Sequence, residues 1–120
     1  MSGNEAIKIG IVAGEHSGDR LGAGIIRALK SSVNVELYGV GGPELSAEGL
    51  NSEFNFKKLQ VMGLIEPLMN YRELSNLRKD LIKLFLENEI DYFIGVDSPD
   101  FNMAIHKKKK IKNSAKNIQL

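Results

Sequence analysis

The chain has 120 residues, of which 42% are hydrophobic, and carries 16 basic against 15 acidic residues. These totals predict one small globular domain, and no window approaches the roughly 20 apolar residues of a membrane-spanning helix. The first residues lack the basic start and apolar core of a secretory signal, and the absence of cysteine excludes disulfides and thiolate sites. We therefore expect a cytoplasmic protein.

The first 30 residues predict a strand, a glycine-bearing turn and a helix. β-Branched residues indicate a short buried strand: Ile7, Ile9, Ile11 and Val12. Apolar residues at helical spacing follow: Leu21, Ile25, Ile26 and Leu29. Residues 13–19 join the two elements, with Ser17 or Asp19 as the expected helix cap. Ligands of open α/β sheets bind at such turns, outside the carboxyl ends of the strands. A plain capped turn without a ligand is the alternative.

Later segments continue the alternation of strands and helices. Val35 to Val40 predict a second strand, and Pro43 fits the first turn of a short helix that spans 44–48 and closes at Gly49. Phe54 and Phe56 alternate as in a short strand. A continuous apolar stripe predicts a helix over 71–85, and buried strands are expected at 92–96 and from residue 116 onward.

This alternation is typical of an α/β fold with a Rossmann-like parallel sheet covered by helices on both faces. Right-handed crossovers would open the turn after Gly14 and the loop after Val96 at the same edge of that sheet. We therefore expect Glu15, Ser17 and Asp97 to share one cleft. We assign residues 1–105 to an incomplete Rossmann-like lobe and 106–120 to a tail that carries five lysines among its first seven residues.

Four motifs carry a family resemblance, in order and in register over about residues 6–105. They are Ala-Gly-Glu-x-Ser-Gly-Asp-x-Leu-Gly-Ala at 13–23, Gly-Gly-Pro at 41–43 with Ala-Glu-Gly at 47–49, Val-Met-Gly at 61–63, and Gly-Val-Asp-Ser-Pro-Asp-Phe-Asn at 95–102. Together they resemble the lipid-A-disaccharide synthase family.

The resemblance implies the N-terminal lobe of a GT-B glycosyltransferase, an enzyme of two Rossmann-like lobes. Such an enzyme transfers 2,3-diacylglucosamine from its UDP donor to 2,3-diacylglucosamine 1-phosphate (lipid X), with inversion and release of UDP. It implies no cofactor and no bound metal, and His16 and His106 lack the spacing of metal ligands. By this resemblance, we expect the second lobe, which carries most UDP-binding residues in the family, to lie outside these 120 residues. We therefore expect no transferase activity from this chain alone.

The resemblance also selects the site residues. Asp97 is expected to be the general base that takes the acceptor hydroxyl proton, and the alternative is a structural aspartate that binds backbone amides in its turn. Glu15, Ser17, Gly18 and Asp19 would line the cleft and contact sugar or phosphate oxygens, and the cap of its own helix is the favoured alternative for Asp19. Met62 would border the acyl-sugar cleft, and Asn102 would hold Asp97 or a sugar hydroxyl, with a helix cap as the alternative.

Two segments bear on partners. The apolar residues within 61–69 would dock on a membrane surface as a peripheral contact, or else pack under the 71–89 helix. The four lysines at 107–110 would attract anionic lipid head groups, or else form a solvated helix end. Nucleic acid is not an expected partner, because no aromatic residues interleave with the basic run. Two other functions stay open: a non-catalytic remnant that binds acyl sugar, and a stand-alone nucleotide-binding or receiver-like module.

Overall fold

The computed structural model describes residues 5–52, 71–96 and 116–119. These ranges contain seven elements in the order β1 (Ala6–Ala13), α1 (His16–Lys30), β2 (Asn34–Val40), α2 (Pro43–Ala47), α4 (Tyr71–Glu87), β3 (Tyr92–Val96) and β4 (Lys116–Gln119). The strands predicted at 7–12, 35–40, 92–96 and from 116 are confirmed, as are the helices predicted around 44–48 and 71–85. The strand expected around Phe54 and Phe56 and the boundary expected at 105–106 lie outside the described residues.

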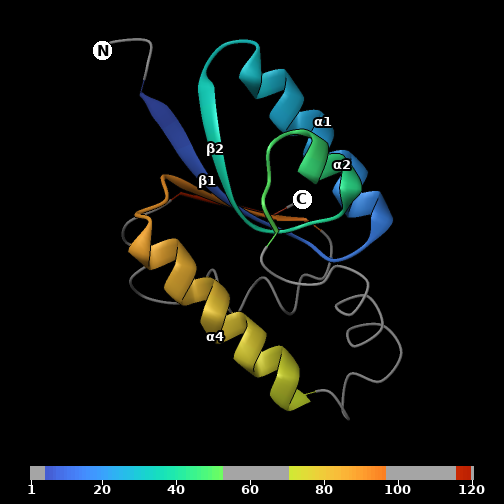
Figure 1. The fold of residues 1–120 in the computed structure, drawn as a ribbon, viewed down its shortest axis with the longest axis vertical. Helices are drawn as coiled ribbons and strands as arrows, with labels where there is room; N and C mark the ends of the chain where they lie inside the picture. Colours follow the sequence, from blue (N-terminus) through green and yellow to red (C-terminus); the bar gives the residue numbers. More distant parts are fainter. Residues whose placement is uncertain (1–4, 53–70, 97–115, 120) are drawn as a thin grey trace.

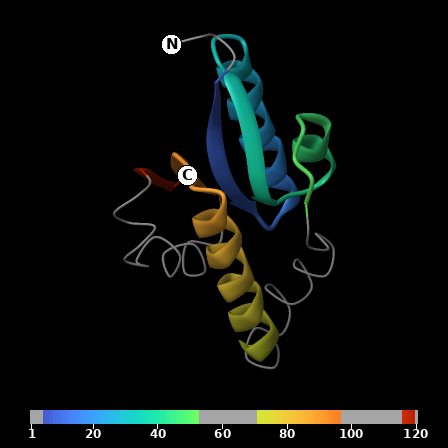
Figure 2. The ribbon, with the colours of Figure 1, turned by 60° about the vertical axis from the view of Figure 1, so that its left-hand side comes forward.

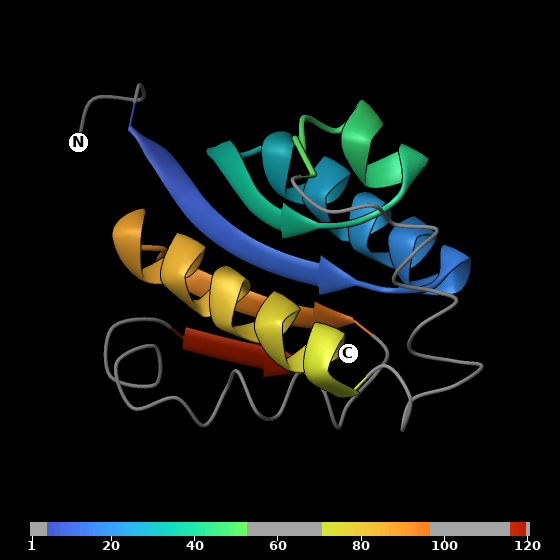
Figure 3. The ribbon, with the colours of Figure 1, turned by 60° about the horizontal axis from the view of Figure 1, so that its bottom comes forward.

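The four strands form one parallel sheet in the order β2-β1-β3-β4. Figure 1 labels β1 and β2 side by side, and Figure 3 shows all four strands in this order. Helices α1 and α2 lie on one face of this sheet and α4 on the other (Figure 3). Parallel neighbours need crossover connections, and helices on both faces provide them. The predicted Rossmann-like α/β fold is therefore confirmed.

Alternating residues of the strands separate the core into two clusters. Ile9, Ile11 and Ala13 of β1 pack with Ala23, Ile26 and Leu45 on the α1–α2 face. Val12 packs instead with Phe85 and other residues of α4 on the opposite face. Because successive side chains of a strand point to opposite faces, the near-continuous apolar sequence of β1 serves both clusters.

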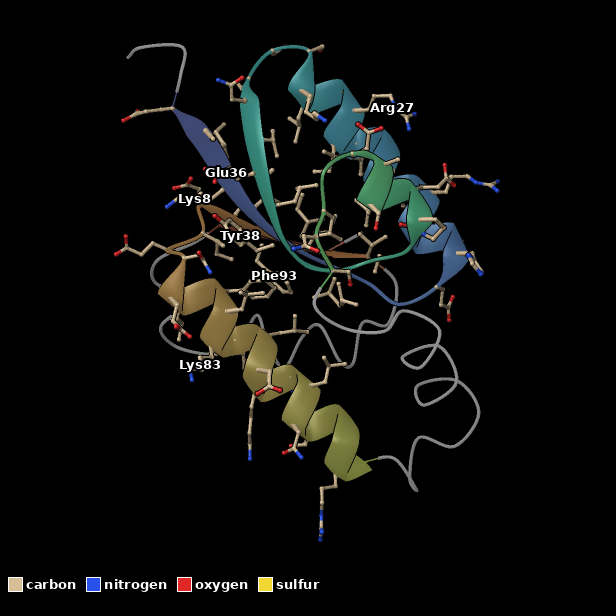
Figure 4. All side chains as sticks on the ribbon, in the orientation of Figure 1. Lys8, Arg27, Glu36, Tyr38, Lys83 and Phe93 are labelled. Carbon is tan, nitrogen blue, oxygen red and sulfur yellow. The ribbon has the colours of Figure 1, made fainter. Side chains whose placement is uncertain are left out.

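The α4 layer lies close against β1 and β3. The rings of Phe85 and Phe93 meet at a centroid distance of 5.3 Å, and Phe93 extends from β3 toward α4 (Figure 4). A Cβ added at Gly10 would lie 2.8 Å from side-chain atoms of Phe85 and Ile90, so only glycine fits there without movement. This contact fixes the spacing between α4 and the sheet.

The buried face of α1 consists mostly of small residues. Among the four residues of the predicted apolar stripe, Ile26 is buried, whereas Leu21 is 50% and Leu29 38% exposed. Three further buried residues of α1 are small: Gly18, Gly22 and Ala23. A Cβ at Gly22 would already lie 3.2 Å from Ile11 Cδ1, so the helix lies too near the sheet for a stripe of leucines. Leu21 and Leu29 share the helical spacing of Ile26 but therefore remain partly in solvent.

Gly24 lies on the exposed side of α1 and provides a test of this packing. No atom lies within 4 Å of a Cβ built there. Gly24→Ala should therefore raise the free energy of unfolding by about 0.5–1 kcal/mol, because alanine loses less backbone entropy than glycine in a helix. Urea denaturation followed by circular dichroism measures the change. A lower unfolding free energy for this variant would contradict the packing of α1.

Candidate functional site at the carboxyl edge of the sheet

The strand order reverses between β1 and β3. After β1 the chain builds β2 on one side of it, and the later strand β3 lies on the other side. The register pairs Ala13 with Val96, so the last residues of β1 and β3 are direct neighbours. The two turns expected to form the cleft therefore begin side by side, at the kind of switch point where ligands of open α/β sheets bind.

Glu15 occupies the N-cap position of α1. Its backbone is extended (φ −135°, ψ 159°), and its carbonyl oxygen accepts the Asp19 N–H at 2.9 Å. Glu15 is half-buried, Ser17 is exposed and Gly18 is buried. The expectation that Ser17 or Asp19 caps α1 is wrong, because Glu15 takes the N-cap position, and the side chain of Glu15 makes no capping hydrogen bond.

Asp19 caps a different helix. This residue is 1% exposed and lies in the first turn of α1. Its Oδ1 accepts the backbone N–H groups of Gly42 and Leu45, and its Oδ2 accepts that of Glu44, each at 2.9 Å. Asp19 thus provides the cap of α2. The expectation that it lines the ligand cleft is not supported by these bonds, which point toward β2.

The start of α2 explains why its cap comes from another helix. Its N-cap is Gly42, which has no side chain, and Pro43 has no N–H to satisfy. The carboxylate of Asp19 binds the next two amides, and the Ser46 N–H bonds the carbonyl of Gly42. The Gly-Pro start, which offers no local capping side chain, is the sequence signal that could have indicated a distant cap, although not the residue that supplies it.

Ion pairs on the surface join the same two helices. Arg20 contacts Glu44 at 3.3 Å, and Arg27 contacts Glu48 at 3.0 Å. Lys30 lies 3.5 Å from the other oxygen of Glu48. Figures 2 and 4 show α2 beside α1, with Arg27 labelled on the outer side of α1. Exposed pairs of this kind add less than about 1 kcal/mol each, so the buried Asp19 bonds dominate the contact.

Tyr38 lies away from this edge, on the α4 face of β2. Its hydroxyl donates a hydrogen bond to Glu36 Oε1 at 3.3 Å. Burial, and then the charge and hydrogen bond of Glu36, raise the pKa of Tyr38 above its ordinary value. Because the group lies midway along β2, it takes no part in the candidate site.

Comparison with known protein families shows to which family the chain with this site belongs. The family described as lipid-A-disaccharide synthetase matches residues 9–119, which covers the sheet and both turns. The chain belongs to this family. Lipid-A-disaccharide synthases are glycosyltransferases of lipid A biosynthesis, as the motifs at 13–23 and 95–102 predicted.

Individual relatives of the lipid-A-disaccharide synthase family agree. A lipid-A-disaccharide synthase of Pseudomonas fluorescens (strain Pf0-1) is 53% identical over 103 residues, 85% of this chain and 27% of its own length. Those of Alkalilimnicola ehrlichii and Salmonella typhimurium are each 46% identical, over 87% and 93% of this chain. The chain spans 28% and 30% of these two relatives, and so less than a third of each protein compared.

The structure describes half of the residues that the lipid-A-disaccharide synthase motifs selected. Glu15 is the N-cap of α1, and Ser17 and Gly18 lie in the first helical turn that follows it. Asp97, Met62 and Asn102 lie outside the described residues, although Asp97 directly follows Val96 of β3. Within 5–52, 71–96 and 116–119, no three His, Asp or Glu side chains gather as metal ligands, and neither α1, α2 nor α4 is long and apolar enough to cross a membrane. His106, residues 61–69 and the lysines at 107–110 also lie outside those ranges.

Proposed function

We propose that this chain forms the acyl-sugar-binding lobe of a lipid-A-disaccharide synthase. The reaction joins the anomeric carbon of UDP-2,3-diacylglucosamine to the 6-hydroxyl oxygen of lipid X. The carbon–oxygen bond to UDP breaks, the configuration inverts, and the hydroxyl proton passes to a base. The observation that supports this function is the pairing of Ala13 with Val96, which brings the starts of the two family motifs together.

Each motif has a separate role in this proposal. Asp97, at the end of β3, is the general base that accepts the proton of the attacking hydroxyl. Glu15 and Ser17 bind sugar or phosphate oxygens, and Gly18 allows the substrate to approach the first turn of α1. The N-terminus of this 15-residue helix adds a partial positive charge that favours a phosphate. Met62 borders the acyl chains, and Asn102 orients Asp97 or a sugar hydroxyl.

The activity is proposed for a protein in which this lobe is joined to a UDP-binding lobe. By the family resemblance, the part of the relatives that this chain does not span holds most UDP-binding residues. The 120 residues alone should therefore release no UDP. No cofactor enters the proposed transfer, since UDP is the leaving group. The proposal also includes a cytoplasmic location with peripheral contact to the membrane through 61–69 and the lysines at 107–110.

An exchange enzyme tests the function directly. In it, this chain replaces the matched segment of the Pseudomonas fluorescens relative, whose 53% identity favours a compatible join. We expect UDP release from UDP-2,3-diacylglucosamine only when lipid X is present. A folded exchange enzyme that releases no UDP would contradict the proposal and favour the non-catalytic remnant. The family match already favours a transferase over a receiver-like module.

Glu15→Gln tests the substrate contact of the β1–α1 turn. Loss of a charge-assisted hydrogen bond should raise the KM for lipid X or for the donor about 10- to 100-fold, with a smaller change in kcat. Steady-state kinetics of the exchange enzyme measure both constants. Arg27→Gln is the matched control on the same helix, because it removes an exposed ion pair remote from the turn. An unchanged KM in Glu15→Gln would show that Glu15 does not bind the substrate.

A further inference from the structure

We infer that Asp19 is a positioning residue for the proposed acyl-sugar site. Its backbone lies in the first helical turn of α1, close to Glu15 and Ser17. Its side chain binds backbone amides where the loop after β2 leads into α2. It thereby sets the direction in which Glu15 and Ser17 face the substrate. This inference rests on the proposed function and adds a residue that does not itself touch the substrate.

The bonds of Asp19 connect the two turns without an intermediate residue. Its N–H donates to the carbonyl of Glu15 at 2.9 Å, which ties Asp19 to the N-cap of α1. Its two carboxylate oxygens accept three N–H groups from residues 42–45, and the bonds to Gly42 and Leu45 are buried. Any rotation of the first turn of α1 would therefore break hydrogen bonds in the β2–α2 turn.

Capping alone does not require this arrangement. A serine or asparagine at position 42 would cap α2 locally and would bury no charge. The chain has glycine there and buries the carboxylate of Asp19 to 1% exposure, which is unfavourable unless several hydrogen bonds compensate. What the distant cap adds is a rigid connection between α1 and the end of β2.

The position of Asp19 explains how it acts without substrate contact. The register pairs Val12 with Val40, so the turns after β1 and β2 are neighbours, and the bonds of Asp19 join them. The proposed cleft lies on the other side of β1, between the turns after β1 and β3. Asp19 thus binds on the side of the β1–α1 turn that faces β2, and the side that faces β3 is left to the substrate.

Asp19→Asn in the exchange enzyme tests the inference. The amide cannot accept all three N–H groups, so the turn should shift, and kcat/KM should fall about 10- to 100-fold through KM, since small displacements of binding groups have effects of this size. The acid limb of the kcat pH profile should stay in place, because Asp97 is unaffected. Amide exchange of Glu44 and Leu45 should be faster than in the unaltered enzyme.

Ile26→Val is the matched control for stability. It removes one methyl group from the buried face of the same helix, about two helical turns beyond Asp19. Both variants are assayed at a temperature at which each is folded. If Asp19→Asn keeps the KM of Ile26→Val, Asp19 only supports the fold and the inference is wrong. If Asp19→Asn does not fold, Asp19→Glu, which keeps a carboxylate on a longer side chain, is assayed instead. A KM above that of Ile26→Val then supports the inference, and a KM equal to it contradicts the inference.

Glu15→Gln separates this inference from the proposed function. An unchanged KM in Glu15→Gln would contradict the proposed substrate contact, whatever Asp19→Asn shows. A raised KM in Glu15→Gln together with an unchanged KM in Asp19→Asn would contradict only the positioning role. A raised KM in both variants supports both.

Discussion

Asp97→Asn in the exchange enzyme is expected to lower kcat about 10²- to 10⁴-fold, the usual contribution of a general base. The amide cannot accept the proton of the attacking hydroxyl, so this proton would have to pass to water. KM should change little, because asparagine retains the size and hydrogen-bonding oxygen of the side chain. The acid limb of the kcat pH profile should disappear together with the carboxylate. UDP release, followed under saturating lipid X, measures the rate.

Asp91→Asn provides a matched control at the opposite end of the same strand. Asp91 precedes β3, and its Oδ2 accepts the N–H of Lys8 at 2.9 Å, whereas its own N–H donates to the carbonyl of Lys8 at 2.7 Å. This variant retains a possible acceptor and lies at the amino edge of the sheet, away from the proposed cleft. Its kcat should equal that of the unaltered enzyme. An equal kcat in Asp97→Asn would show instead that Asp97 is a structural turn residue.

Gly39→Ala is expected to have the largest effect on stability. Gly39 has φ +136°, a conformation that residues with a Cβ rarely adopt, and it lies opposite Ile11 in the β1–β2 ladder. An added Cβ would overlap the backbone carbonyl oxygen of Ile11, which cannot rotate away as a side chain can. Backbone strain and overpacking together should lower the free energy of unfolding by about 3–5 kcal/mol.

Two other glycines separate the causes of this loss. Gly49 also has positive φ (+105°), but a Cβ there would meet no atom within 4 Å, so Gly49→Ala should lose only about 1 kcal/mol through backbone strain. Gly24→Ala has neither strain nor contact and should be stabilising. Urea denaturation of the three variants gives the order. If Gly39→Ala and Gly49→Ala were equally destabilised, the close approach of β2 to β1 would be wrong.

Local patterns were sufficient to predict the elements of this fold. The β-branched run at 7–12 has the pattern of a buried strand, and the apolar stripe at 71–85 has the spacing of one helix face. Residues of that stripe are buried in α4 as expected: Leu77, Leu81 and Phe85. Pro43 and Gly49 bounded α2 because proline fits the first turn of a helix and glycine accepts positive φ after it. The family was also readable from the motifs, since their residues occur at fixed spacing in the sequence.

The buried side of α1 was not predictable in the same way. Leucines at positions 21 and 29 suggested a contact face, but burial depends on how near the helix lies to the sheet. Gly18 and Gly22 permit a short distance, so α1 turns its small residues inward and leaves Leu21 and Leu29 partly in solvent. Periodicity shows which residues of a helix share a face, but it does not show whether their side chains fit between the helix and the sheet.

The role of Asp19 depended on the tertiary structure for a related reason. An acidic residue in the first turn of a helix is ordinarily read as a cap or dipole partner of that helix, because such interactions are local. Here the donors are 23 to 26 residues away, at amides whose own segment offers no capping side chain. The sequence alone determined the strands, the helices, the family and the motifs from which the site is proposed, because each depends on the spacing of residues that are close together in the sequence. Only the folded chain decided which faces and which amides those residues meet, because these contacts join segments far apart along the chain.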